Sequence, residues 1–317
     1  MTVPSFSRLL RPLAASLLAA TLSACGGITI QADTSNGPAG TRNVPTPAPT
    51  TAAAPRPPAN SADSTAEGLK LARLLRDQGR YEGAAGVYAQ LEQRGALKPL
   101  EMLEYASVAS PVQSPQENLA LFGRARRALN EAGAKLSAAA TVTLCNGLGR
   151  ARMNMGLQDA ALADFDCTLA VDANNVPALN AKGVLLDARG DHDGARKLFS
   201  QALELDPSDF RALNNLALSH LASGDPEQAI RLLSQTDART MPTLALNLAF
   251  ARALQGDEAG ARQSLSAIMS PSLVPRALED FAQRRQRIRD GAPVAGELLA
   301  ASRHLLQLRE QEKDGNG

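Results

Sequence analysis

The stretch "NAKGVLLDARGDHDGARKLF", residues 180–199, decides the fold, because versions of it recur along the chain. The other copies are "NGLGRARMNMGLQDAALADF" (146–165), "NNLALSHLASGDPEQAIRLL" (214–233) and "LNLAFARALQGDEAGARQSL" (246–265). The copies at 146, 180 and 214 begin 34 residues apart, and the last begins 32 residues after the third. Such a period predicts stacked helical units, each of which contacts only its neighbours.

Four positions keep their character in each copy. A glycine near the middle fits a left-handed C-cap, so we expect it to separate two short helices. Small residues at two positions let these helices approach closely, and a large apolar residue fills the space between one pair and the next. The glycine is Gly156, Gly190, Gly224 and Gly256, and the first small residue is Gly149, Gly183, Ala217 and Ala249. The second small residue is Ala161, Ala195, Ala229 and Ala261, and the large residue is Phe165, Phe199, Leu233 and Leu265. Pro207 is expected to end a second helix, because proline cannot continue one.

This pattern resembles the tetratricopeptide repeat, which implies an all-α helical solenoid. An earlier copy is "LARLLRDQGRYEGAAGVYAQL" (71–91), and "LEYASVASPVQSPQENLALFGRARRAL" (103–129) is a degenerate one that Pro111 and Pro115 interrupt. We predict a solenoid over 64–274, with clear repeats at about 142–270 and a divergent pair at about 64–131. Residues 275–317 are expected to form capping helices and a tail.

The N-terminus has the parts of an export signal. Arg8 and Arg11 precede an apolar run, Leu13 to Ala20, which is too short to span a bilayer. The following "LSAC" (22–25) resembles the lipobox of bacterial lipoproteins, which implies removal of residues 1–24 and lipidation of Cys25. Because Gly26 replaces the aspartate that retains such proteins at the inner membrane, the resemblance implies the periplasmic face of the outer membrane. A plain secretory signal that contains a cysteine is the alternative.

Residues 25–63 are predicted to be the lipidated cysteine and a disordered linker rich in proline, alanine and threonine. The stretch "GPAGTRNVPTPAPTTAAAPRPPAN" (37–60) has seven prolines and no apolar periodicity. Such a composition cannot bury enough surface to fold. It would act as an extended tether or as a spacer of no particular length.

Composition and motifs exclude several functions. The formal charge of +1 leaves no global footprint for nucleic acid, so we expect no nucleic-acid partner. The chain lacks H-E-x-x-H, G-x-S-x-G, Walker A and C-x-x-C motifs. The three histidines are scattered, and "DHD" at 191–193 falls where each repeat turns between its helices. We therefore predict that the protein is not an enzyme and has no metal and no cofactor.

The asparagines are the candidate binding residues. They recur at one position of the first helix in three copies and one position later in two, namely at Asn146, Asn180 and Asn214, and at Asn215 and Asn247. In tetratricopeptide repeat proteins these positions line the concave groove, where amides can bind the backbone of an extended peptide. A structural role is the alternative, because the repeat consensus itself often carries asparagine at the later position.

Three other features have two interpretations each. Cys145 and Cys167 form an even pair, which in an oxidising periplasm is a candidate disulfide, although whether position 167 faces its partner stays open. The run "RRQRIR" (284–289) is a solvated helix face, or a contact for anionic lipid or an acidic partner. A leucine stripe belongs to a capping core or to a partner site; its members are Leu298, Leu299, Leu305, Leu306 and Leu308.

Lipobox, tether and repeat array together resemble the TadD family, the lipoproteins of the tight-adherence (Flp) pilus assembly system. The most similar part is "NNLALSHLASGDPEQAIRLLSQTDARTMPTLALNLAFARALQGD" (214–257), within a resemblance that covers roughly residues 64–290. The resemblance implies a protein that binds the pilus secretin or another subunit and helps it assemble or localise at the outer membrane, and it carries over no catalytic residues. The alternative is a repeat scaffold in outer-membrane protein insertion or cell-wall synthesis.

Overall fold

The structure, a computed structural model, describes residues 61–236 and 241–315. The predicted signal, the lipobox with Cys25 and nearly all of the predicted linker lie outside these residues. The first helix begins at Ser61, a little before the solenoid boundary predicted at residue 64. Within the described residues there are helices and turns and no strand.

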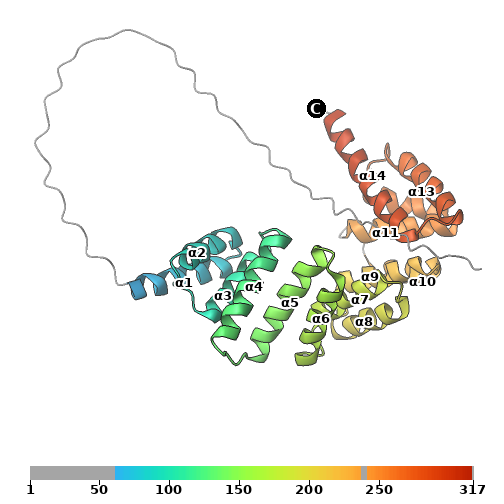
Figure 1. Ribbon diagram of the computed structural model, residues 1–317. Coiled ribbons are helices and arrows are strands. Elements are labelled where there is room, and N and C mark those ends of the chain that lie inside the picture. The colour runs from blue at the N-terminus through green and yellow to red at the C-terminus, as the bar shows by residue number, and fades with distance from the viewer. Residues whose placement is uncertain (1–60, 237–240, 316–317) are drawn as a thin grey trace, which may run out of the picture. The chain divides into compact units, whose positions relative to one another are not determined.

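The helices follow one another in pairs joined by short turns (Figure 1). Each helix packs against the next one along the chain from α2 onward, which is the arrangement of a solenoid. The predicted all-α solenoid is confirmed. The bounds are α1 Ser61–Asp77, α2 Tyr81–Gln93, α3 Pro99–Ala109, α4 Pro115–Glu131, α5 Ala138–Asn154, α6 Gln158–Val171, α7 Val176–Asp187, α8 His192–Leu205, α9 Phe210–Ala222, α10 Pro226–Leu233, α11 Pro242–Gln255, α12 Glu258–Ser266, α13 Val274–Arg289 and α14 Val294–Gly315.

The glycine expected between the helices of each pair has the predicted conformation. Gly190 lies between α7 and α8 with φ of 84°, and Gly156, Gly224 and Gly256 are also left-handed. A residue with a Cβ is strained there, which is why glycine recurs at this position. Pro207 follows the end of α8 at Leu205, as expected.

The recurring small and large residues meet within each pair. A Cβ added to Gly183 would lie 2.6 Å from Cε1 of Phe199, and one added to Gly149 would lie 2.8 Å from Cε1 of Phe165. Phe199 also packs with Leu216 of the next helix, α9. The phenylalanine therefore fills the space inside its own pair as well as the predicted space toward the next pair.

The interpretation of Pro115 as an interruption was wrong. Pro115 is the first residue of α4, where the missing N–H costs nothing. The Ser114 hydroxyl accepts a hydrogen bond from the backbone N–H of Glu117, and the Glu117 carboxylate accepts one from the backbone N–H of Ser114. The degenerate stretch thus forms a complete pair, α3 and α4, with Pro111 in the turn between them.

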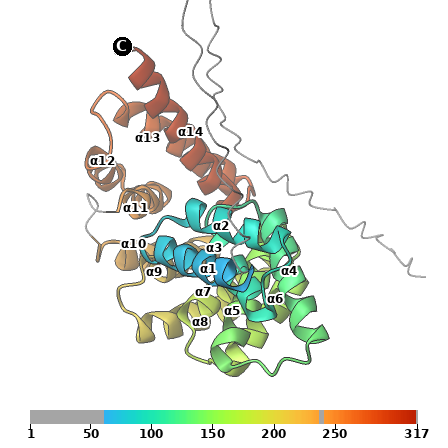
Figure 2. The same cartoon turned by 90° about the vertical axis from the view of Figure 1, so that its left-hand side faces the viewer.

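The last two helices cap the array, and α14 also contacts an earlier repeat. Leu298, Ala301 and Leu305 of α14 pack into one core with α11, α12 and α13, as a cap requires. However, α14, which lies beside α13 in Figure 2, also contacts α9, which belongs to an earlier pair. The C-terminal helix therefore reaches back along the first helices of the preceding repeats. Within residues 61–236 and 241–315, no helix combines the length and apolarity that a membrane crossing needs.

Candidate functional site

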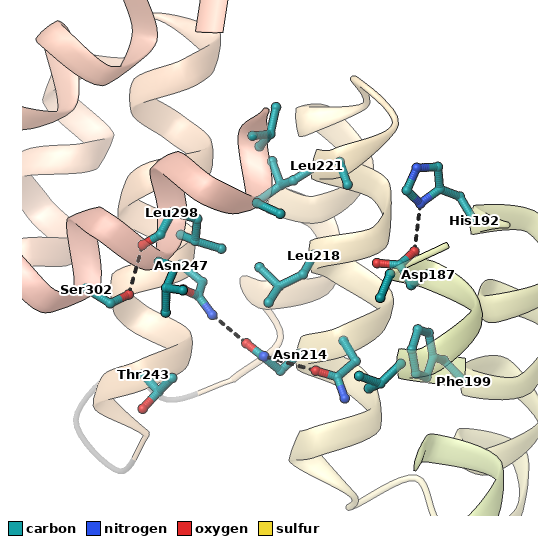
Figure 3. Close-up of a pocket in the computed structure, with 17 residues that line it drawn as sticks. Asp187, His192, Phe199, Asn214, Leu218, Leu221, Thr243, Asn247, Leu298 and Ser302 are labelled. Atoms are coloured by element: carbon teal, nitrogen blue, oxygen red, sulfur yellow. Dashed lines mark hydrogen bonds and ion pairs between the residues drawn. The ribbon is translucent and has the colours of Figure 1, made fainter. Parts of the chain in front are cut away.

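A cavity of about 510 Å³ lies where α14 faces the first helices of the repeats (Figure 3). Residues from α7, α9, α11 and α14 line it, together with His192 and Phe199 of α8. Its walls are mainly apolar and include Leu218, Leu221 and Leu298. An open, largely apolar hollow with a few polar groups has the character of a binding site.

The asparagines of this region form one chain of hydrogen bonds. The Asn247 amide donates to Oδ1 of Asn214 at 2.6 Å, and Asn214 donates to Oδ1 of Asn215 at 3.5 Å. Asn215 in turn donates to Oδ1 of Asn180 at 2.9 Å. The chain connects α11, α9 and α7, so these amides hold neighbouring repeats in register. Asn214, Asn215 and Asn247 also line the cavity, where they can offer hydrogen bonds to a ligand.

The first asparagine of the predicted row lies apart from this chain. Asn146 donates to Oδ1 of Asn175 at 3.1 Å and accepts a hydrogen bond from the Thr168 hydroxyl at 3.3 Å. Neither Asn146 nor Asn180 lines the cavity. The structure therefore brings together Asn180, Asn214, Asn215 and Asn247, and it leaves Asn146 in a separate contact with Thr168 of α6 and with Asn175, the N-cap of α7.

Asp187 is the charged residue of the cavity that the sequence analysis missed. It is the last residue of α7, and its Oδ1 accepts a hydrogen bond of 2.6 Å from the buried Ser219 hydroxyl on α9. The same oxygen lies 2.7 Å from Nδ1 of His192, the first residue of α8. The histidine of "DHD" therefore bonds to the Asp187 carboxylate. Asp191 caps α8, because its carboxylate accepts a hydrogen bond from the Gly194 N–H. Among the described residues, no group of three or more His, Cys, Asp or Glu could hold a metal ion.

The structure corrects the expectation for the basic run. Arg284 is buried and forms ion pairs with Asp280 at 2.6 Å and Glu297 at 3.0 Å. Arg287 pairs with the same Glu297 at 2.9 Å, and its guanidinium lowers the pKa of that carboxyl. The run is therefore not a uniformly solvated basic face, because two of its arginines fasten α13 to α14.

The leucine stripe is divided between the core and the cavity. Leu298 and Leu305 are buried, as predicted for a capping core, whereas Leu299 is 53% exposed and lines the cavity. The side chains of Leu306 and Leu308 lie outside the described part of the structure. Leu299 is consequently an apolar residue on the rim of a binding site.

Cys145 and Cys167 join α5 to α6. The structure places them in a disulfide with a Cα–Cα distance of 6.1 Å. Position 167 therefore does face position 145 across the helix pair. Neither cysteine lines the cavity.

Family models for the tetratricopeptide repeat match residues 69–99, 146–210 and 187–240. A Sinorhizobium fredii protein, y4yS, is 46% identical over 68 residues, which are 22% of this chain and 37% of that protein. The chain thus matches little more than a third of the length of that relative.

One solved structure supports the same fold. A tetratricopeptide repeat protein from Parabacteroides merdae is 18% identical, with a TM-score of 0.53 over 76% of this chain and 93% of its own. YrrB, a repeat protein whose structure is described as having an unusual peptide-binding site, is 19% identical with a TM-score of 0.43, over 65% of this chain and 98% of its own. Over its described residues the chain is a helical solenoid, and its sequence carries tetratricopeptide repeats over residues 69–99 and 146–240.

Proposed function

We propose that this protein is a non-enzymatic, lipid-anchored lipoprotein of the outer membrane that binds an extended segment of a pilus or secretion machine subunit, most specifically the secretin. In this role it helps the machine to assemble or localise. The observation that carries the proposal is the cavity between α14 and the first helices of the repeats, which offers an apolar wall and a row of amides to a bound chain.

The lining supports a polypeptide as the ligand. Its apolar residues can hold a side chain, while the amides of Asn214, Asn215 and Asn247 can pair with backbone N–H and C=O groups. Each such hydrogen bond contributes about 0.5–1.5 kcal/mol net. Because an extended chain presents these groups at regular intervals, it matches a site built from repeated helices better than a compact small molecule does.

Two features support a place outside the cytoplasm. The motif at Cys25 resembles a lipobox, and with Gly26 after it this resemblance implies a lipidated residue at the periplasmic face of the outer membrane. The disulfide between Cys145 and Cys167 also fits an oxidising compartment, where such bonds persist. The secretin and the pilus system come from the sequence resemblance alone.

Leu299→Asp is expected to reduce partner capture by about tenfold or more. The change removes an apolar contact from the cavity rim and places an unpaired polar group against the bound chain, and a polar group buried without a partner costs about 1–3 kcal/mol. Leu299 is more than half exposed, so the folded state should tolerate the change. The measurement is a crosslinking pull-down from native membranes together with secretin multimer assembly.

Leu205→Asp is the matched control. Leu205 ends α8, is 42% exposed and does not line the cavity, so the same substitution there should leave capture and assembly unchanged. Equal effects of the two variants, or no effect of Leu299→Asp, would refute the groove as the binding site. Recovery of an outer-membrane insertion or cell-wall synthesis protein in place of the secretin would refute the pilus assignment while keeping the groove.

A further inference from the structure

Asp187 gives the cavity a charge that the repeat pattern does not require. The corresponding positions in the other three copies are Met153, Leu221 and Ala253, all apolar. Ser219, which holds the Asp187 carboxylate, also stands where the other copies have alanine or leucine. A carboxylate and a hydroxyl therefore replace two apolar residues across the contact between α7 and α9. Removing a carboxylate from water costs stability even when it is paired, so the presence of Asp187 at an apolar repeat position needs an explanation.

The position of the carboxylate points to a ligand. Ser219 and His192 both contact Oδ1, and Asp187 keeps 23% of its side chain exposed while lining the cavity. In Figure 3, Asp187 and His192 lie at one end, Leu298, Ser302 and Thr243 lie toward the other, and Leu218 lies between them. The site therefore places a fixed carboxylate beside an apolar wall.

The charge balance of the lining fixes the sign of the ligand. Among the lining residues, all within the described part of the chain, Asp187 is the single carboxylate and there is no lysine or arginine. An anionic ligand would find no lysine or arginine there, and the one histidine of the lining, His192, is already bonded to Asp187. A cationic group would gain a charge-assisted hydrogen bond in a partly desolvated site.

From this arrangement we infer that the cavity binds a peptide segment in which a lysine or arginine is close to a large apolar residue. The cation bonds to Oδ2 of Asp187, and the apolar side chain packs against Leu218, Leu221 and Leu299. Ser219 is a positioning residue, because its hydroxyl fixes the carboxylate through Oδ1. This inference rests on the proposed function, since it names the chemistry of the chain that the groove holds.

The test is selection from a random peptide display library with the purified full chain. Peptides are kept only if Leu299→Asn, which removes the apolar contact without adding a charge, strongly weakens their binding, which assigns them to the cavity. We expect the selected peptides to combine a large apolar residue with lysine or arginine. Changing that cation to glutamine should weaken binding to the wild-type protein by about tenfold, the effect of a charged hydrogen bond. The same change should have little effect on binding to Asp187→Asn, because the partner charge is already absent.

A second variant tests the charge without disturbing the Ser219 contact. Ala188 is exposed, lines the cavity and follows Asp187, so Ala188→Lys adds a competing cation there. Ala188→Lys should weaken the binding of a lysine-containing peptide several-fold relative to the binding of the same peptide with glutamine in place of lysine. Ala188→Gln should leave this ratio unchanged. Circular dichroism checks that each variant is folded.

The outcomes separate the two proposals. If no selected peptide depends on Leu299, both the groove function and this inference are wrong. If peptides depend on Leu299 but carry no cation, or prefer aspartate or glutamate, the groove function stands and the inference falls. The inference also falls if the preference for lysine persists unchanged in both Asp187→Asn and Ala188→Lys.

Discussion

Phe199→Ala is expected to lower the free energy of unfolding by about 3–5 kcal/mol, the usual cost of emptying a buried phenylalanine site. The ring is 1% exposed and is enclosed by its own helix pair and by α9, so its surroundings cannot collapse into the space. Denaturant unfolding of the full chain measures the loss. Phe210→Ala is the control, because Phe210 is 48% exposed and its loss should cost less than about 1 kcal/mol.

Gly183→Ala tests the same packing more sharply, because its effect on the free energy of unfolding should change sign with the residue at position 199. In the wild type the new Cβ would lie 2.6 Å from the Phe199 ring, so alanine should destabilise by about 1–3 kcal/mol. In the Phe199→Ala background the clash is absent, and alanine should stabilise α7 by about 1 kcal/mol through its higher helix propensity. Equal effects in both backgrounds would contradict the packing described for the repeat.

Cys25→Ser is expected to abolish fractionation with the outer membrane. The thiol is the atom that the lipid modifies in proteins with this motif, and serine cannot replace it. The expected product is unprocessed or soluble, as judged by sedimentation of membranes and by the mass of the chain. Cys145→Ser is the control, since it removes a cysteine of the solenoid disulfide and should leave fractionation unchanged. Sedimentation of the Cys25→Ser protein with outer membranes would refute the lipid anchor.

The sequence was most informative where the repeat was most regular. The left-handed Gly190 and the need for a small residue at position 183 could be predicted, because each belongs to a pattern seen in every copy. The contact of Gly183 with Phe199 inside one pair was not predicted, because the large residue was expected to lie between pairs. Pro115 was misinterpreted for the opposite reason. Its stretch departs from the repeat, so the proline was taken as an interruption, although Ser114 and Glu117 form a recognisable helix start.

The C-terminal helix could not be placed from sequence. Its leucines indicate an amphipathic helix, but no repeat period relates it to α9 or α11, so only tertiary packing determines which helices it meets. For the same reason Leu299 was grouped with the core leucines, whereas it lines the cavity.

The asparagine row and Asp187 show which features of the site could be predicted from the repeat copies and which could not. The register of Asn214 and Asn247 could be read from the copies, but their hydrogen bond to one another depends on the spacing between α9 and α11. Asp187 did have a signal in the sequence, since it replaces Met153, Leu221 and Ala253 of the other copies. A search for polar residues at otherwise apolar repeat positions would have found it.

The most direct measurement of the central claim is site-specific photo-crosslinking in cells that make the full chain. A photoreactive amino acid replaces Leu299 on the cavity rim in one strain and Leu205 at the end of α8 in another. We predict that position 299 gives one crosslinked product, which mass spectrometry identifies as a segment of the secretin, and that position 205 does not give it. The same product from both positions, or from position 205 alone, would contradict binding in the groove.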